Sequence, residues 1–289
     1  MAFDPCGLFS VLVTPFQADG ALDTGSLARL VDFNLAAGAS GLLVLGMAGE
    51  AAYLSEDERQ LVAEKVATSA EGRPVVAGVS DADTNVAASR AAEMAALGVS
   101  AVMVAVPPDV SRLVDHVSAV AAAANPLGVI VQDYPPSGHP KVSAQELAAL
   151  ARQVPSIVAM KAEDPSTPNK IAELLQLIPH VRQLGGLGGL YGFWELKAGS
   201  AGMITGFAFP EHLIRIIGHA AAGDWAAAQR WYERALPAMV WESQPGIEVG
   251  LRKLLLHARG VIDTAVTRAP MGNLRNCARD ARSIVASQQ

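Results

Sequence analysis

One of the six lysines of the chain, Lys161, differs from the others in its sequence context. It ends the apolar run 157–161 (IVAMK), whereas the other five fall in helical patterns or beside a helix start, where solvated ammonium groups are expected. The two-residue period of a strand places Ile157, Ala159 and Lys161 on one face. Burial of an unpaired ammonium group lowers the pKa of a lysine, and a neutral amine condenses with carbonyl groups. Lys161 is therefore the candidate nucleophile for C–C or C–O bond cleavage through a Schiff base.

An alternative keeps Lys161 structural. The strand would then end one residue earlier, and Lys161 would pair with Glu163 or Asp164. The pattern of residues alone leaves both interpretations open.

Other catalytic constellations find less support. The six histidines are scattered, and the sequence has no HExxH pattern and no clustered carboxylates, so we predict no metal site and no cofactor. The serines lack a GxSxG elbow. The glycine-rich stretch 185–189 (GGLGG) lacks the Gly-Lys-Ser/Thr ending of a phosphate loop, and close approach of a substrate to the backbone explains it better. Glu195, just beyond this stretch, is expected to be solvated.

The elements that would position Lys161 form a repeating pattern. Short, nearly continuous apolar runs alternate with segments of helical periodicity, as expected for parallel strands that are buried on both faces. Eight such repeats with short loops predict an α/β fold, a closed (β/α)8 TIM barrel, in which catalytic residues lie at the C-terminal ends of the strands. The predicted strands are residues 7–13, 41–45, 74–79, 101–106, 128–132, 157–161, 181–184 and 202–206.

The sequence pattern changes after residue 208, because strand-like runs largely stop after Pro210. Helices are predicted at 224–242, 246–259 and 273–287, so we place the barrel at 1–208 and a C-terminal helical region at 209–289. Within the barrel, Ser55 with Glu58 and Ser143 with Glu146 form capping-box patterns at two helix starts.

The composition agrees with a buried globular protein, since 51% of the 289 residues are hydrophobic and 17% are charged. The net charge of −6 without a basic run argues against a nucleic-acid partner. No apolar run reaches the ~18–20 residues that cross a bilayer, and the N-terminus lacks a secretion-signal pattern. Two distant cysteines, Cys6 and Cys277, fit a reducing compartment, so a cytoplasmic location is expected.

Several motifs in order resemble those of the dihydrodipicolinate synthase / N-acetylneuraminate lyase family of class I aldolases. They are 13–16 (VTPF) after strand one, 46–50 (GMAGE) after strand two, 133–135 (DYP) after strand five, and Met160-Lys161 on strand six. The glycine-rich strands seven and eight and the C-terminal helices also fit. The resemblance extends over nearly the whole chain. It implies that Lys161 forms the Schiff base with pyruvate or another 2-keto acid.

The resemblance also implies roles for other positions. The turn after strand two matches the carboxylate-binding turn of the family, so the backbone N–H groups of Met47 and Ala48 would hold the substrate carboxylate. Ile204 matches a position that contacts the Schiff base, and Thr205 beside it would donate a hydrogen bond. The alternatives are a plain glycine turn at 46–50 and a barrel-core role for Ile204 and Thr205.

Three departures from the family pattern bear on the reaction. The family usually has hydroxyl residues where this chain has Met47 and Ala48, so a side-chain hydroxyl relay is absent. The family's proton-carrying tyrosine stands three residues before the proline of the motif, where this chain has Gln132. An amide orients substrate but carries no proton, so Tyr134 is the candidate proton carrier, with packing beside Pro135 as the alternative.

The third departure concerns the substrate. Dihydrodipicolinate synthase has an arginine after the strand-five proline that grips a second carboxylate, whereas this chain has 136–139 (PSGH) there. The aromatic residue that synthase subunits lend to a neighbour is replaced by 107–109 (PPD). The predicted function is therefore a Schiff-base lyase, either an aldolase that releases pyruvate or a dehydratase of a 2-keto-3-deoxy sugar acid.

Two further hypotheses remain. One is a genuine 4-hydroxy-tetrahydrodipicolinate synthase with a rearranged proton relay, and the other is a barrel that binds a keto acid without turning it over. The resemblance also implies a homo-oligomer, a tetramer or a dimer.

Overall fold

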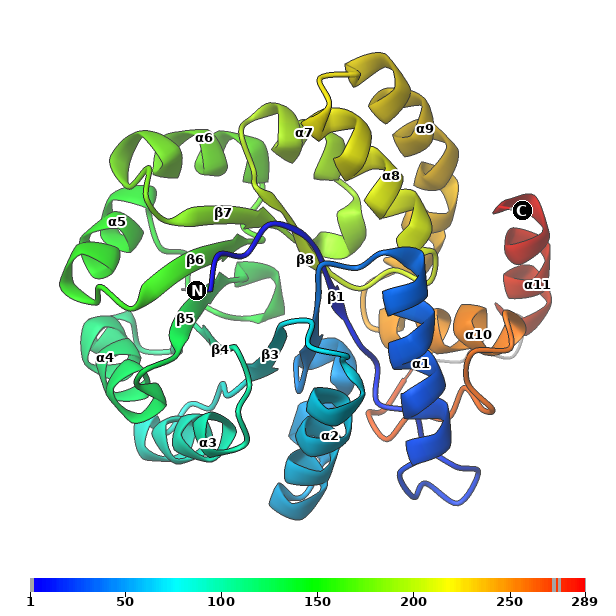
Figure 1. Cartoon of the computed structure of the whole chain (residues 1–289), viewed down its shortest axis with the longest axis horizontal. Coiled ribbons are helices and arrows are strands. Elements are labelled where there is room, and N and C mark those ends of the chain that lie inside the picture. Colours follow the sequence, from blue (N-terminus) through cyan, green and yellow to red (C-terminus); the bar gives the residue numbers. More distant parts are fainter. Residues whose placement is uncertain (1–2, 272–273, 275–276, 289) are drawn as a thin grey trace.

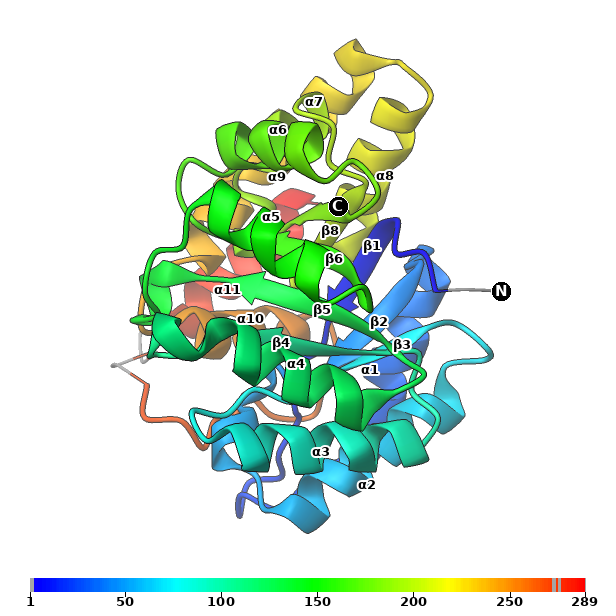
Figure 2. The same ribbon diagram turned by 90° about the vertical axis from the view of Figure 1, so that its left-hand side faces the viewer.

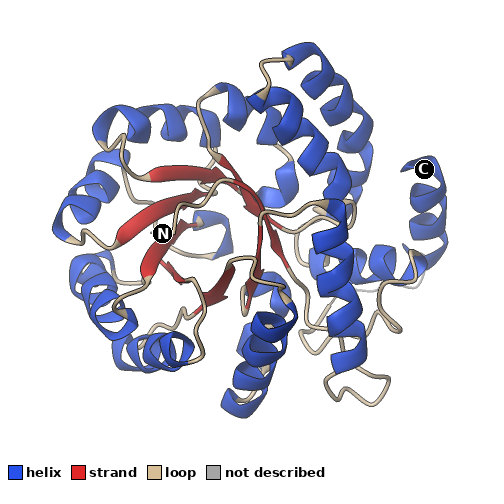
Figure 3. Ribbon diagram, viewed as in Figure 1, coloured by secondary structure: helices blue, strands red, loops and turns tan. Residues whose placement is uncertain are grey.

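Eight parallel strands form a closed barrel in the computed structural model, which describes residues 3–271, 274 and 277–288 (Figure 1). The strands neighbour one another in chain order, from β1 to β8 and back to β1. Helices surround them, as the colouring by secondary structure shows (Figure 3). The strands are β1 (Gly7–Val11), β2 (Gly41–Val44), β3 (Val75–Gly78), β4 (Ala101–Ala105), β5 (Gly128–Asp133), β6 (Ile157–Ala162), β7 (Arg182–Gly185) and β8 (Gly202–Thr205). The predicted TIM barrel is confirmed.

The helices fall into an outer ring and a C-terminal group. The ring comprises α1 (Thr24–Ala37), α2 (Glu56–Ser69), α3 (Thr84–Ala96), α4 (Leu113–Ala124), α5 (Ala144–Gln153), α6 (Thr167–Leu177), α7 (Gly192–Lys197) and α8 (Pro210–Ala221). The C-terminal group comprises α9 (Trp225–Glu242), α10 (Glu248–Ala258) and α11 (Cys277–Gln288). Short 3₁₀ helices follow four of the strands: η1 (Met47–Gly49) and η2 (Ala51–Tyr53) follow β2, η3 (Val110–Arg112) follows β4, η4 (Pro135–Ser137) follows β5, and η5 (Leu187–Gly189) follows β7.

Apolar side chains fill the inside of the barrel. Every strand contributes to one buried interior cluster, because alternate residues of a strand face the same side. Its members are Phe9, Val11, Leu43, Val76, Ala101, Met103, Ile130, Ala159, Leu184 and Ile204. A second, larger cluster joins the outer faces of the strands to the helices. The continuous apolar runs of the sequence arise from these two faces.

The predicted helix starts are confirmed at both capping boxes. Ser55 and Glu58 cap α2 reciprocally, and Ser143 and Glu146 cap α5 in the same way. These caps supply acceptors for N–H groups that have no partner within the helix.

One predicted face was wrong in β6. Val129 of β5 pairs with Ile157, but the next residue, Ile130, pairs with Ala159, so Val158 is an extra residue in a β-bulge. Ile157 consequently packs in the outer cluster, whereas Ala159 lies in the interior. The bulge leaves Ala159 and Lys161 on the interior face, as predicted, and removes Ile157 from it.

The C-terminal helices lie beside the barrel. In the side view the blue segment with β1 lies on the right of the molecule, and the orange C-terminal segment lies on the left (Figure 2). The predicted helix 224–242 is α9, with Asp224 as its N-cap. Asn273, the predicted start of the last helix, lies outside the described residues, and α11 begins at Cys277. Among the described helices, none has the length and apolar character needed to traverse a lipid bilayer.

Candidate active site

Lys161 points into the mouth of the barrel and is almost completely buried, with 6% of its surface exposed. The strand does not end early, since β6 continues through Ala162. Lys161 lies in register with Gln132 of β5 on one side and with the interior residue Leu184 of β7 on the other. The structure therefore places Lys161 at the C-terminal end of β6, as predicted.

The expectation that the amine is unpaired was wrong. Lys161 Nζ lies 3.0 Å from Oε2 of Glu163, and both side chains are buried. The pairing that was weighed as the structural alternative thus exists, but it lies inside the mouth of the barrel. A buried charge needs such a partner, because desolvation of a lone ammonium group costs several kcal/mol.

Glu163 is the centre of this polar cluster, and its sequence context predicts no more than an ion pair with Lys161. Its Oε2 also accepts a hydrogen bond of 2.7 Å from Nε2 of Gln132, and its Oε1 accepts one of 3.0 Å from the backbone N–H of Leu187. Three elements, β5, β6 and η5, therefore fix one carboxylate beside the amine. A carboxylate two residues after a strand-end lysine was the only sequence signal for this arrangement.

Gly186 makes room for the carboxylate of Glu163. A Cβ atom at this position would lie 2.3 Å from Glu163 Oε1 and 2.4 Å from its Cγ, which real contacts exclude. Leu187 follows with a φ of 48°, a conformation that turns its N–H toward Glu163. The side chain of Glu163 therefore makes the close approach that explains Gly186. The predicted approach of a substrate is not needed to explain this glycine.

Tyr134 lies just beyond the end of β5, so it is not part of the strand that carries Gln132. It is the N-cap of η4, with φ −131° and ψ 70°, and its side chain is partly buried. Burial raises the pKa of Tyr134, and the negative charges of Glu163 and Glu248 raise it further. The phenol is thus held in its protonated form close to the carboxylate that pairs with Lys161.

The turn after β2 presents backbone donors. Its closing hydrogen bonds are donated by Gly49, Glu50 and Ala51, and within the described residues none is donated by the N–H groups of Met47 and Ala48. Ala48 packs against the interior cluster, whereas the side chain of Met47 is half exposed. The hydroxyl of Thr14 donates to the carbonyl of Gly49 at 2.6 Å and ties the turn to the segment after β1.

The two candidate residues of β8 face different sides. Ile204 is fully buried in the interior cluster. Thr205 Oγ1 accepts a hydrogen bond of 2.9 Å from the N–H of Gly188, so it holds η5, the loop that also donates to Glu163. Gln132, by contrast, reaches Glu163 directly.

Glu195 is fully buried, so the prediction that it is solvated was wrong. A Cβ at Gly185 would overlap its carboxylate, and the hydroxyl of Thr167 donates to Oε1 at 2.5 Å. Burial raises the pKa of Glu195 to about 7, against the lowering effect of the Thr167 hydrogen bond; the charge of Glu163 raises it further. An amphipathic pattern could not reveal this, because α7 is only six residues long.

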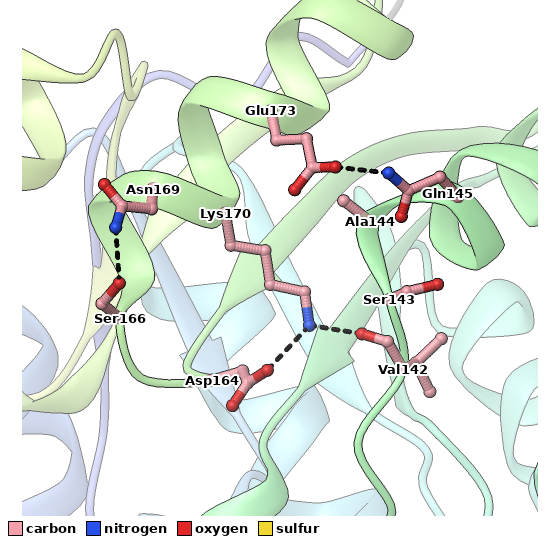
Figure 4. Close-up of a pocket in the computed structure, with 9 residues that line it drawn as sticks. All are labelled: Val142, Ser143, Ala144, Gln145, Asp164, Ser166, Asn169, Lys170 and Glu173. Atoms are coloured by element: carbon pink, nitrogen blue, oxygen red, sulfur yellow. Dashed lines mark hydrogen bonds and ion pairs between the residues drawn. The ribbon is translucent and has the colours of Figure 1, made fainter.

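Two lysines that were expected to be solvated form ion pairs instead, and one of them is buried and the other partly buried. Lys170 Nζ lies 2.5 Å from Asp133 and 3.1 Å from Asp164, at a cavity of about 280 Å³ between the starts of α5 and α6 (Figure 4). Lys253 is fully buried and lies 2.5 Å from Glu50. The partners of these two ammonium groups are Asp133 at the end of β5, Asp164 after β6 and Glu50 after β2, whereas Lys161 lies in register with the interior residue Leu184.

The cluster can perform proton transfer beside a nucleophilic amine. Glu163 is within 3.0 Å of Nζ, so it can accept the proton that the amine must lose before it attacks a carbonyl group. Gln132 and the N–H of Leu187 stabilise the carboxylate form between proton transfers. Among the described residues, no group of histidine, cysteine and carboxylate side chains could hold a metal ion.

A parallel barrel with a buried lysine at the end of its sixth strand is the architecture of Schiff-base aldolases. Residues 4–289 match the model of the dihydrodipicolinate synthetase family, and the chain belongs to this family. The family, the barrel and the lyase class that were predicted from the sequence are thereby confirmed.

Individual relatives carry different names. An L-2-keto-3-deoxyarabonate dehydratase of Azospirillum brasilense is 31% identical over 93% of this chain and 89% of its own length. A 4-hydroxy-tetrahydrodipicolinate synthase of Acidobacterium capsulatum is 30% identical over 84% and 83%. The crystal structure of a dihydrodipicolinate synthase from Rhodopseudomonas palustris has a TM-score of 0.92 and 28% identity, and the match covers 99% of this chain and 98% of that one.

Proposed function

We propose that the chain is a Schiff-base dehydratase of a 2-keto acid that carries a hydroxyl group on C4, such as a 2-keto-3-deoxy sugar acid. The observation that supports this most strongly is the carboxylate of Glu163, 3.0 Å from Lys161 Nζ. Elimination of water needs a base at C3, the carbon next to the imine, and Glu163 stands beside the nitrogen that forms the imine. The similarity to the dehydratase of Azospirillum brasilense is in agreement.

The first half of the reaction forms the iminium ion that later accepts the electrons of the C3–H bond. Glu163 takes a proton from the ammonium group of Lys161, and the free amine attacks the C2 carbonyl of the substrate. The proton held by Glu163 then passes to the carbinol oxygen, which leaves as water, so that the iminium ion forms and Glu163 is again a carboxylate. The N–H groups of Met47 and Ala48 hold the substrate carboxylate, which the iminium charge also attracts. Ile204 packs below the imine in the apolar interior.

The second half eliminates the C4 hydroxyl. Glu163 takes a proton from C3, and the electrons of the C3–H bond form the enamine. The enamine then expels the C4 hydroxyl, to which Tyr134 gives its phenolic proton, so that water leaves and a C3–C4 double bond forms. Hydrolysis of the unsaturated iminium ion restores Lys161, and the proton held by Glu163 returns to Tyr134. Gln132 orients the carboxylate throughout, and Thr205 holds the loop that donates to it.

A second candidate is an aldolase that releases pyruvate, and the position of Tyr134 supports it. Aldol cleavage needs a base for the proton of the C4 hydroxyl, and the Tyr134 phenol can relay this proton to the carboxylate of Glu163, whose charge acts on it. Synthesis of 4-hydroxy-tetrahydrodipicolinate has less support, since no arginine follows Pro136. The oligomeric state, the division of the chain at residue 208 and a cytoplasmic location stay predictions.

Trapping with borohydride tests the proposal. The protein is incubated with pyruvate or with 2-keto-3-deoxy sugar acids and then reduced, and mass spectrometry locates the adduct. We expect an irreversible adduct on Lys161 and release of an unsaturated or rearranged keto acid with loss of one water. An adduct with release of pyruvate and an aldehyde would favour the aldolase. An adduct without any turnover would favour a keto-acid-binding barrel, and no adduct with any 2-keto acid would refute the Schiff base.

A further inference from the structure

We propose that Glu50 is a positioning residue that couples the C-terminal segment 264–271 to binding of the keto-acid carboxylate. This inference rests on the proposed function, because it assigns the turn of Met47 and Ala48 to that carboxylate. The segment 264–271 contains no helix or strand, and it is called the strap below.

Glu50 closes the turn with its backbone and anchors it with its side chain. Its N–H donates to the carbonyl of Met47 at 2.9 Å, and its φ of 53° places it in the left-handed region. The residue is 2% exposed. A non-glycine residue in this region is uncommon and is maintained by its surroundings.

The surroundings of Glu50 come from the C-terminal part of the chain. Its Oε1 lies 2.5 Å from Lys253 Nζ of α10, and its Oε2 accepts hydrogen bonds of 2.7 Å from the N–H groups of Arg268 and Ala269. Lys253 also donates to the carbonyl of Val266 at 2.8 Å. One carboxylate thus joins the substrate turn to α10 and to the strap, more than 200 residues away in sequence.

The strap has further anchors that do not involve Glu50. The guanidinium group of Arg268 forms two hydrogen bonds with Glu58 of α2, at 2.6 and 2.7 Å, and it donates to the carbonyl of Gly20. Arg268 and Lys253 both contact the ring of Phe16, 4.5 and 4.3 Å from its centroid. The strap therefore stays attached to the barrel when only the bonds of Glu50 are removed.

This arrangement makes the affinity for a carboxylate depend on the strap. The N–H groups of Met47 and Ala48 converge on an anion only while the turn keeps its shape, and Glu50 fixes that shape from behind. Linkage then requires the reverse effect: a ligand on the turn must stabilise the bonds between Glu50 and the strap. The role of Glu50 is therefore distinct from simple support of the fold.

The test uses two variants: Glu50→Gln alone, and the double variant Glu50→Gln with Lys253→Met. The double variant avoids leaving the buried ammonium group of Lys253 without a partner. Glu58→Gln is the matched control, since it removes the charge from a different anchor of the strap and leaves the bonds between Glu50 and the strap in place. Formation of the borohydride-trapped pyruvate adduct is measured against pyruvate concentration. We expect the half-saturating concentration to rise about tenfold in the double variant, with an unchanged plateau, because coupling energies commonly give 5–150-fold effects. Glu58→Gln should match the wild type.

Hydrogen exchange gives a second readout. Pyruvate should slow exchange of the amides of Arg268 and Ala269 in the wild type. Without ligand, the double variant should exchange the amide of Gly49, which closes the turn onto the carbonyl of Gly46, faster than Glu58→Gln does. Either of two results overturns the inference. One is an unchanged half-saturating concentration in the double variant, and the other is an exchange rate at Arg268 and Ala269 that does not change when pyruvate is added. If the wild type forms no adduct, the proposed function fails, and the ligand-free comparison still decides whether Glu50 holds the turn.

Discussion

The buried carboxyl group of Glu195 should make the stability of the protein fall as pH rises from about 4.5 to about 7. In the folded protein its pKa is about 7, raised from 4.5 by burial against Gly185 and α6. Between these two pH values the folded state holds a proton that the unfolded state has released. The stabilisation is therefore complete below pH 4.5 and is lost as pH rises through 7. At about 1.4 kcal/mol per pH unit, the loss amounts to roughly 3 kcal/mol.

Glu195→Gln tests this value, because glutamine stays neutral and keeps an acceptor for the hydroxyl of Thr167. Free energies of unfolding from urea titrations at pH 5, 6, 7 and 8 are compared for the two proteins. The difference between them should shift by about 2.5 kcal/mol in favour of the variant between pH 5 and pH 8. Other buried carboxyl groups such as Glu242 act equally in both proteins and cancel. Glu93→Gln, at an exposed position, should follow the wild type, and parallel curves for Glu195→Gln and wild type would refute the reasoning.

Three substitutions examine the site itself. Gly186→Ala places a Cβ 2.3 Å from Glu163 Oε1, so we expect turnover to fall by at least about 100-fold, the usual contribution of a positioned acid or base, whereas Gly218→Ala, which meets no neighbour within 4 Å, should leave it unchanged. Tyr134→Phe should spare the borohydride adduct and abolish dehydration, and persistent turnover would assign Tyr134 to packing. Thr205→Val removes the acceptor for Gly188 N–H and should lower turnover without preventing the adduct; kinetics equal to wild type would show that η5 holds Glu163 without it.

The barrel was predictable because its strands are buried on both faces. Each predicted strand agrees with the structure to within two residues at either end, since parallel strands appear as apolar runs that end where polar loops begin. The placement of Lys161 followed from the same pattern. The prediction for Ile157 was wrong because of the bulge at Val158, since an inserted residue reverses the alternation of faces. In a run of apolar residues the sequence does not show where such a residue is inserted.

The polar interior was harder to predict, because its partners are distant in sequence. Glu50 pairs with Lys253, which lies 203 positions later in the chain, and Glu195 packs against Gly185 of β7. Each of these residues looks like an ordinary helix or loop charge until its partner is known. Glu163 was recognised only as a possible ion-pair partner for Lys161, because its contacts with Gln132 and Leu187 depend on the closure of the barrel.

The most direct test of the central claim is the exchange of the methyl protons of pyruvate in deuterated water, followed by NMR spectroscopy. It requires the imine on Lys161 and the base Glu163, and it does not require the natural substrate. We predict exchange with the wild type, an adduct that forms more slowly and no exchange with Glu163→Gln, and neither with Lys161→Arg. Exchange at the wild-type rate by Glu163→Gln would contradict the assignment of Glu163 as the base that acts beside the Schiff base.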